Sequence, residues 1–140
     1  MRHDNPIIAA AALLGLSGVA LGAFGAHALA NLLEEREMAY VWETAVTYHF
    51  VHSLALLALG IWSRFDPDNK LLRPTAILWV LGVLIFSGSL YIIAVGGPTA
   101  VAPFTPLGGI FFLLGWGLLL PASARNGSAR SAADPVPHSQ

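Results

Sequence analysis

The sequence predicts an all-α membrane protein, a bundle of four transmembrane helices. Three observations lead to this fold class. Apolar residues make up 56% of the 140-residue chain and charged residues only 11%, less than half the charged share usual in soluble domains. The charged residues cluster, and the uncharged runs between them have the length that a membrane-spanning helix needs. These runs also lack the alternation of apolar and polar residues that is typical of transmembrane β-barrels.

Each uncharged run predicts one or two helices. Residues 7–26 contain neither a charged residue nor a histidine, and residues 44–63 are interrupted only by two histidines. Residues 74–124 form a run of 51 residues without Asp, Glu, Lys or Arg. This length is too great for one helix and fits two, with a break at Gly96-Gly97-Pro98. The expected helices are therefore 6–30, 42–63, 72–95 and 105–121.

These helices define a single transmembrane domain over residues 1–121. Residues 122–140 are rich in Ser, Ala and Pro, so we expect a disordered tail. The first helix resembles a signal peptide in two respects, because Arg2 gives a positive start and Ala26-His27-Ala28 matches the cleavage pattern. Its apolar run is longer than the roughly 7–15 residues of a signal peptide, so we expect the helix to be retained. Cleavage would leave three helices.

The basic residues predict the orientation of the bundle. With four helices, six of the seven Lys and Arg residues lie on one side of the membrane and only Arg36 on the other. Because Lys and Arg favour the cytoplasmic side, we expect both termini in the cytoplasm. Tyr40 and Trp42 near the outer boundary and Trp62 near the inner one fit an interfacial aromatic belt. The six residues on the cytoplasmic side are Arg2, Arg64, Lys70, Arg73, Arg125 and Arg130.

Several kinds of chemistry find no support in the sequence. Cysteine is absent, which excludes disulfides, thiolate metal sites and a cysteine nucleophile. The net charge of −1 gives no reason to expect a nucleic-acid partner. The sequence contains no set of nucleophile, base and acid, and no phosphate-binding loop. We therefore expect no enzymatic activity, no catalytic residues and no cofactor.

Glycines form a stripe along the first helix. Four of them follow one another at spacings of 3, 4 and 3 residues, so they share one narrow face. Small residues let helices approach closely in lipid, where association depends on packing. The stripe packs either against a second copy of the chain or, as we favour, against a neighbouring helix of the same chain. The last helix offers a similar thin face. The predicted packing glycines are Gly15, Gly18, Gly22, Gly25, Gly108 and Gly109.

Two histidines lie inside the second predicted helix. His49 and His52 are three residues apart, share a face and continue an apolar seam, so both should point into the bundle. Ionisable residues inside a membrane are functional candidates, and half of a metal or haem site or a proton relay are the specific alternatives. We favour neutral histidines that hydrogen-bond a neighbouring helix. A lone His-x-x-His pair is a weak signal and no carboxylate shares its face, so no metal site is expected.

Six polar residues lie within the predicted helices or at their ends. Counted at 1.5 Å per residue, all six fall in the outer half of the membrane. Unsatisfied polar groups in hydrocarbon are costly, so these residues should pair with one another. In particular, we expect His52 to bond a hydroxyl or carbonyl group of the first or third helix. The predicted intramembrane polar cluster is His27, His49, His52, Ser87, Ser89 and Thr105.

Five stretches of the chain occur in a distinctive order. They are Gly22–His27, Thr44–Val46 with Tyr48 and His52, Phe86–Tyr91, Thr105–Gly109, and Gly115-Trp116. In this order they resemble the small membrane proteins of domain-of-unknown-function family 423, which includes the eukaryotic transmembrane protein 256. The resemblance spans about residues 7–120 and implies a four-helix protein of the bacterial inner membrane with no established activity. His52 matches a histidine of the family pattern, whereas His49 falls where members often carry Gln, which favours a hydrogen-bonding role for position 49.

The leading functional hypothesis is a non-enzymatic accessory, assembly or envelope-maintenance protein. Its expected partners are the lipid bilayer and either another membrane protein or a second copy of the chain. A small oligomeric transporter or channel is the first alternative, suggested by the two intramembrane histidines. A histidine-based metal- or haem-binding redox protein is the second.

Overall fold

The computed structural model describes residues 5–131, in which every regular element is a helix and no strand occurs. Four stretches are long and apolar enough to cross a membrane: Pro6–Ala26, Ala39–Phe65, Leu72–Ala94 and Thr99–Ala124. The predicted fold class, an all-α protein with four membrane helices, is confirmed. The elements are α1 (Pro6–Ala26), α2 (Ala30–Glu35), α3 (Ala39–Phe65), α4 (Leu72–Gly82), the π-helical turn η1 (Val83–Ser87), α5 (Gly88–Ala94), the 3-10 turn η2 (Thr99–Val101) and α6 (Phe104–Ser131).

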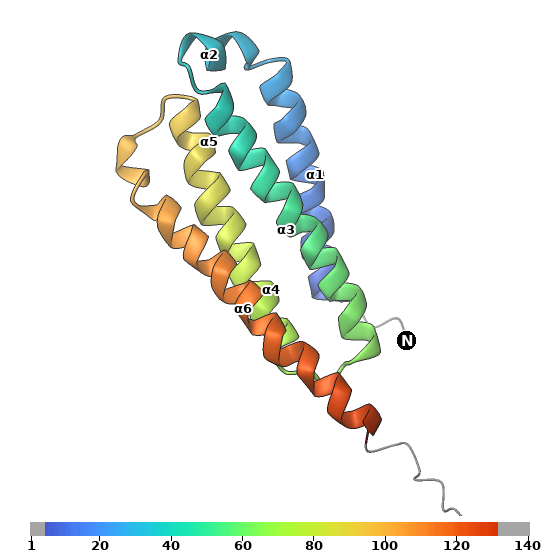
Figure 1. Ribbon diagram of the computed structural model, residues 1–140. Helices are drawn as coiled ribbons and strands as arrows, with labels where there is room; N and C mark the ends of the chain where they lie inside the picture. The colour runs from blue at the N-terminus through green and yellow to red at the C-terminus, as the bar shows by residue number, and fades with distance from the viewer. Residues whose placement is uncertain (1–4, 132–140) are drawn as a thin grey trace, which may run out of the picture.

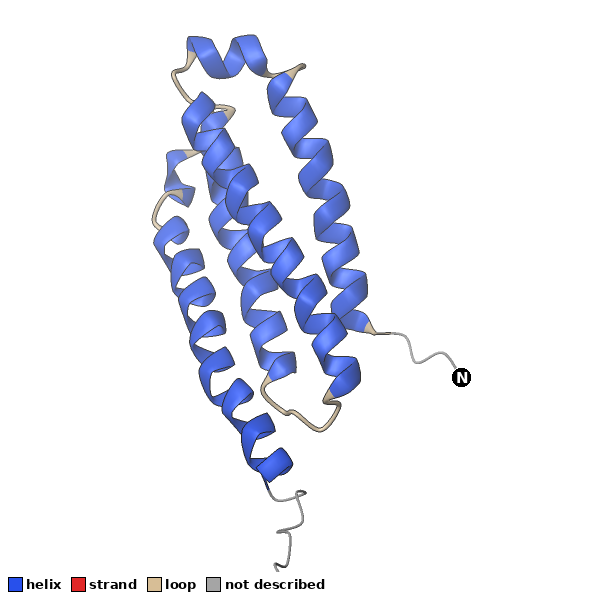
Figure 2. Cartoon of the chain, turned by 45° about the vertical axis from the view of Figure 1, so that its right-hand side comes forward, coloured by secondary structure: helices blue, strands red, loops and turns tan. Residues whose placement is uncertain are grey.

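The long helices lie side by side, and α4, η1 and α5 follow one another as a single long helix (Figure 1). The short α2 crosses one end of the bundle, whereas the start of α1, the α3–α4 loop and the end of α6 lie at the other (Figure 2). Helix α1 packs chiefly on α3, and α6 packs chiefly on α4 and η1. The middle of the bundle is therefore formed by α3 and by the continuous α4–η1–α5 helix.

Two helix ends differ from the sequence-based expectation by four residues or more. The first helix ends at Ala26 instead of residue 30, and α2 follows after a turn. The last helix continues through Pro121 to Ser131, so residues 122–131 are helical where disorder was expected. One physical reason is that Ala122 is buried and its carbonyl accepts a hydrogen bond of 3.1 Å from the Asn69 amide. Residues 132–140 and Arg2 lie outside the described residues.

Two asparagines tie the helices together at the end of the bundle opposite α2. Asn5 caps α1, since its Oδ1 accepts a 3.0 Å bond from the Ile7 N–H group, and Pro6 fills the first helical position. The Asn5 amide also donates to the Gly60 carbonyl at 2.9 Å and so joins α1 to α3. Asn69 in the α3–α4 loop is buried and reaches α6. These side chains fix three helices at one level.

Arg36 ties the opposite end. Its Nε donates to the carbonyl of Ala94, the last residue of α5, at 3.2 Å. A cation is favourable there because the C-terminus of a helix carries partial negative charge. Gly96 adopts a φ of 90° beside the Arg36 guanidinium, and a Cβ at that position would lie 2.8 Å from the guanidinium carbon. The basic residue that stands alone on its side of the membrane in the sequence count thus has a specific structural partner.

The glycine stripe of α1 faces α3 over most of its length. A Cβ at Gly18 would lie 3.4 Å from the Phe50 ring, and one at Gly22 would lie 3.6 Å from Val46. Gly25 lies directly against the indole of Trp42. Gly15 differs, since nothing lies within 4 Å of the Cβ position. Three of the four glycines therefore pack within the chain.

The glycines of α6 make the second close helix contact. Gly108 lies against the backbone of Phe86 in η1, at a separation that leaves no room for a side chain. At Gly109 a Cβ would meet the Phe86 ring at 3.9 Å, an ordinary contact distance. The π-helical turn thus lies where the backbones of η1 and α6 come into close contact.

Trp42 is part of the interior, so its expected place in an interfacial belt is wrong. The side chain is buried in a small cluster with Leu33 and Ala94, and its indole N–H donates to the Leu21 carbonyl at 3.1 Å. Because Gly25 has no side chain, the indole occupies the position that a Cβ would take. Tyr40, two residues earlier, is exposed, as a belt residue should be.

The different surroundings of the stripe glycines give a matched test. Gly18→Leu should lower the free energy of unfolding by about 1–3 kcal/mol, because the side chain has to displace Phe50. Gly15→Leu should have little effect, since its Cβ points into open space. Thermal unfolding of both variants in detergent measures the difference. Equal losses, or unchanged stability of Gly18→Leu with loss of a dimer band, would contradict packing within the chain.

Candidate functional site between the membrane helices

His52 is held by hydrogen bonds at both ring nitrogens. Its Nδ1 lies 2.8 Å from the Tyr48 carbonyl oxygen, and its Nε2 accepts a 3.1 Å bond from the indole N–H of Trp116. A carbonyl oxygen only accepts and an indole N–H only donates. The ring must therefore be neutral, with its proton on Nδ1. This side-chain bond also links α3 to α6.

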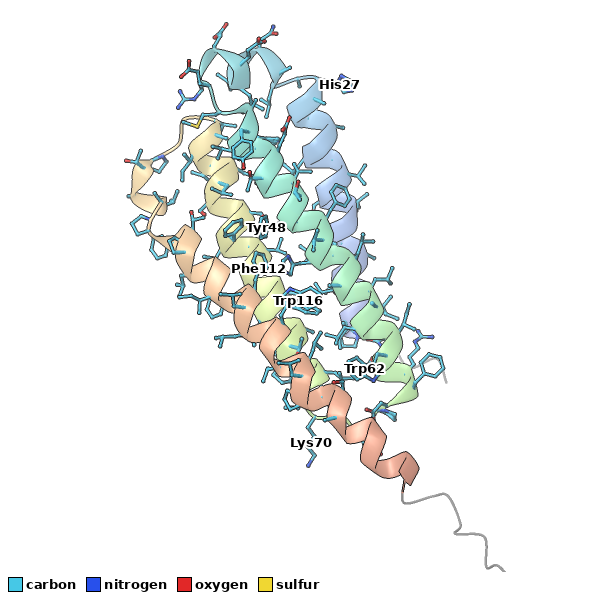
Figure 3. The ribbon with its side chains drawn as sticks, viewed as in Figure 1. His27, Tyr48, Trp62, Lys70, Phe112 and Trp116 are labelled. Atoms are coloured by element: carbon cyan, nitrogen blue, oxygen red, sulfur yellow. The ribbon has the colours of Figure 1, made fainter. Side chains whose placement is uncertain are left out.

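Aromatic rings enclose His52 on the side of α6. The ring of Phe112 stacks on the imidazole with 3.6 Å between centroids and 11° between planes. Trp79 and Trp116 lie edge-on to it at 6.0 and 6.2 Å. Figure 3 shows Tyr48, Phe112 and Trp116 gathered between α3 and α6 at mid-height of the bundle. His52 is only 3% exposed, while Trp116 on the periphery is 45% exposed.

His49 lies among α1, α3 and α5. Its Nε2 is 3.3 Å from the Ser17 hydroxyl of α1, and its Nδ1 is 3.3 Å from the Tyr91 hydroxyl of α5. The ring rests on Gly18, where a Cβ would lie 3.6 Å from its Cδ2. The side chain is 4% exposed. His49 thus joins α1, α3 and α5 as His52 joins α3 and α6.

The six residues of the predicted polar cluster do not form one group. His49 and His52 point to different helices, as described above. The hydroxyls of Ser89 and Thr105 form a separate pair at 2.6 Å between α5 and α6. Ser87 is fully buried, and its hydroxyl has no hydrogen-bond partner within residues 5–131. His27 follows the last residue of α1 and is exposed, and Figure 3 shows it pointing away from the other labelled side chains.

The expected partner of His52 was wrong in one respect. The ring accepts from an indole on the last helix, where a hydroxyl or carbonyl of the first or third helix was expected. The reason is that α6 lies beside His52. Its Phe112 stacks on the imidazole, and its long Trp116 side chain brings the indole N–H within 3.1 Å of Nε2. Hydroxyl groups of the first and third predicted helices do bond a histidine, but that histidine is His49, which meets Ser17 of α1 and Tyr91 of α5.

Three partner residues escaped the sequence analysis as members of the site. They are Ser17, Tyr91 and Trp116. Ser17 carried a usable signal, because it precedes a stripe glycine by one residue and so borders the face that meets α3. Tyr91 and Trp116 also carried a signal. A Tyr O–H or Trp N–H group inside a bundle usually has a hydrogen-bond partner, so each of these residues indicates that a polar group lies nearby.

The chemistry that this arrangement offers follows from how the ring nitrogens are used. All four ring nitrogens of the two histidines already have a hydrogen-bond partner. Among the residues that the structure describes, no three His, Asp or Glu side chains come together in a way that would hold a metal ion. The bonds link helices, and those of His49 also connect three groups that can each donate or accept a hydrogen bond.

Comparison with known proteins identifies the family. The family model described as "Protein of unknown function (DUF423)" matches residues 21–109. This chain belongs to that family. It is 38% identical over 112 residues to a UPF0382 membrane protein of Haemophilus influenzae, covering 80% of this chain and 88% of the relative. It is 41% identical over 111 residues to one of Staphylococcus saprophyticus, covering 78% and 88%.

A third relative adds the location. The UPF0382 inner membrane protein YgdD of Escherichia coli is 37% identical over 115 residues, covering 82% of this chain and 86% of the relative. The names of the relatives and the four apolar helices agree that this DUF423 chain is a multi-pass membrane protein. The expected family resemblance is confirmed. No solved structure gives a significant match.

The bond between His52 and Trp116 can be measured with a double-mutant cycle. His52→Leu should lower the free energy of unfolding by about 0.6–2 kcal/mol, the range for such bonds in membranes. Trp116→Phe removes the N–H donor, and the double variant should lose less than the sum of the two single changes because they share one bond. His27→Leu is the control and should change little. Additive losses would show that the bond contributes nothing.

Proposed function

We propose that this DUF423 protein is a non-enzymatic accessory protein of the membrane, which acts in assembly or envelope maintenance by contact with another membrane protein. The observation that supports this most is the use of its interior polar groups. His49, His52 and the Ser89–Thr105 pair each connect two or three helices. Such groups stabilise a scaffold and leave none of these ring nitrogens free for a substrate.

The outward faces of the two peripheral helices offer the surface for a partner. Leu16 of α1 is 71% exposed and Leu113 of α6 is 74% exposed, and both lie in the membrane spans. Their first partner is the lipid bilayer. The proposed second partner is a membrane protein that replaces lipid on one of these faces.

The two alternative functions need changes to the bonds described above. A metal or haem ligand would require a ring nitrogen that gives up its present partner, either Trp116 for His52 or a hydroxyl for His49. A transporter or channel would require several copies, because each helix in the spans packs directly on its neighbours. The accessory role requires neither change.

Photo-crosslinking in intact membranes tests the accessory role. The photoreactive amino acid p-benzoylphenylalanine is placed at Leu16 or Leu113, with the buried Leu56 as the matched internal control. We expect one discrete adduct with another membrane protein from one of the exposed positions and none from Leu56. Solute flux into liposomes that is lost in His49→Gln, or a bound metal or haem that is lost in His52→Gln, would overturn the proposal.

We also propose that both termini lie in the cytoplasm. Arg64, Lys70 and Arg73 are exposed at the end of the bundle that holds the start of α1, which supports this orientation by the positive-inside rule. Arg36 at the α2 end is bonded to Ala94 and does not balance them.

Single cysteines test the orientation without interference, because the chain has no cysteine of its own. An impermeant thiol reagent added to intact cells should label Glu35→Cys in α2, and should label Asp68→Cys in the α3–α4 loop only after lysis. Both positions are exposed. The reverse pattern would overturn the orientation, and labelling of both in intact cells would overturn the arrangement of the spans.

A further inference from the structure

We infer that His49 is an intramembrane proton-exchange site, at which the imidazole takes up a proton at one ring nitrogen and releases one from the other while it stays bonded to α1 and α5. The inference goes beyond the accessory role and does not rest on it. It depends on the groups that surround the ring and on how those groups differ from the ones around His52.

The partners of His49 are both hydroxyl groups. Tyr91 Oη lies 3.3 Å from Nδ1 and Ser17 Oγ lies 3.3 Å from Nε2. A hydroxyl donates or accepts by rotation of its hydrogen. Ser17 has a further acceptor within reach, since its Oγ lies 3.0 Å from the Leu13 carbonyl and 3.1 Å from that of Leu14. Each ring nitrogen therefore keeps a partner whether or not it carries a proton.

Two neutral arrangements follow. In the first, Tyr91 donates to Nδ1, Nε2–H donates to Ser17, and Ser17 donates to a carbonyl of its own helix. In the second, Nδ1–H donates to Tyr91, and Ser17 turns its hydrogen from that carbonyl to Nε2. The ring keeps both bonds in each arrangement. The exchange is balanced when the proton passes through the two hydroxyls. A hydronium ion gives a proton to Tyr91 Oη as Oη passes its own proton to Nδ1, and Nε2 passes its proton to Ser17 Oγ as Oγ releases its hydrogen to a water molecule.

His52 lacks this freedom, although it lies only one turn away. Its carbonyl partner requires a proton on Nδ1, and its indole partner requires a bare Nε2, so the second tautomer would break both bonds. The bond lengths agree with this difference. Those of His52 are 2.8 and 3.1 Å, whereas both bonds of His49 are 3.3 Å, slightly longer than the usual range.

No charged group fixes the tautomer of His49 from the elements that pack against it. Helix α1 presents Ser17 and Gly18 to the ring, and its residues 6–26 include no charged or titratable side chain. The continuous helix from Leu72 to Ala94 presents Tyr91, and its single charged residue, Arg73, lies at the far end. On α3 itself, the neighbouring titratable groups are Tyr48, whose ring packs on Phe86 and Phe112, and His52, which is bonded toward α6.

Ring nitrogen resonances in ¹⁵N NMR test the inference, because a protonated and a bare imidazole nitrogen differ widely in chemical shift. The full chain is labelled at its five histidines and reconstituted in lipid nanodiscs, and His49→Gln and His52→Gln spectra assign the signals. We expect His52 to show one tautomer, with the proton on Nδ1. We expect His49 to show both tautomers, either as two sets of signals or as intermediate averaged shifts.

Two variants should shift the His49 tautomers in opposite directions. Tyr91→Phe removes the partner of Nδ1 and should move the proton to Nε2, where Ser17 still accepts it. Ser17→Ala removes the partner of Nε2 and should move the proton to Nδ1. Ser53→Ala is the control, since its hydroxyl bonds the His49 backbone carbonyl at 2.7 Å and does not touch the ring. Unchanged His52 signals show in each variant that the bundle is folded.

Opposite shifts in these two variants, with no shift in the control, would support the exchange site. A single His49 tautomer that neither variant changes would overturn it, and so would shifts in the same direction. The result is independent of the crosslinking experiment, because a protein without a membrane partner would still show the two tautomers.

Discussion

Polar atoms inside a membrane have no water to bind, and the structure of this chain depends on how α3 meets that constraint. The helix carries Trp42, His49 and His52, and each of these side chains bonds a different part of the bundle. Because an unsatisfied polar group in hydrocarbon costs free energy, each bond favours one position of the neighbouring helix over all others. Apolar packing alone would specify these positions less sharply, since lipid tails solvate leucine as well as a helix does.

Glycines bring the helix backbones close enough for these bonds to form. On α1 they let the Trp42 and His49 rings lie directly against the helix, so that the indole reaches the Leu21 carbonyl and the imidazole reaches Ser17. On the other side, Gly108 lies against the backbone of Phe86 at the π-helical turn. An extra residue in the turn shifts the side chains that follow it, and Ser89 then meets Thr105.

The sequence was sufficient to predict the number and placement of the membrane helices, because the spacing of charged residues reports the bilayer thickness directly. It also placed both histidines inside the bundle, since position along a helix determines the face. It did not predict correctly which helix His52 meets. That depends on which helices are neighbours, and four uncharged helices of similar length allow several arrangements.

Some local signals were present and were not used. Asn5 followed by Pro6 is the usual start of a helix, and the cap brings the Asn5 amide to Gly60 of α3. Arg36 looked like an exception to a charge count and is instead a helix C-terminal partner. The extension of α6 past Pro121 depends on Asn69, a residue more than 50 positions away, and no local pattern could indicate it.

The arrangement of the helices bears on where a partner can bind. The interior is filled by bonds and aromatic packing that involve α3 and the continuous helix from Leu72 to Ala94, and both histidines are buried in it. Helices α1 and α6 each pack chiefly on one side and leave apolar side chains outside. Both rest on the histidines through Ser17 and Trp116, respectively. A partner that moved either helix would therefore act on a histidine bond, which connects the surface of the bundle to its polar interior.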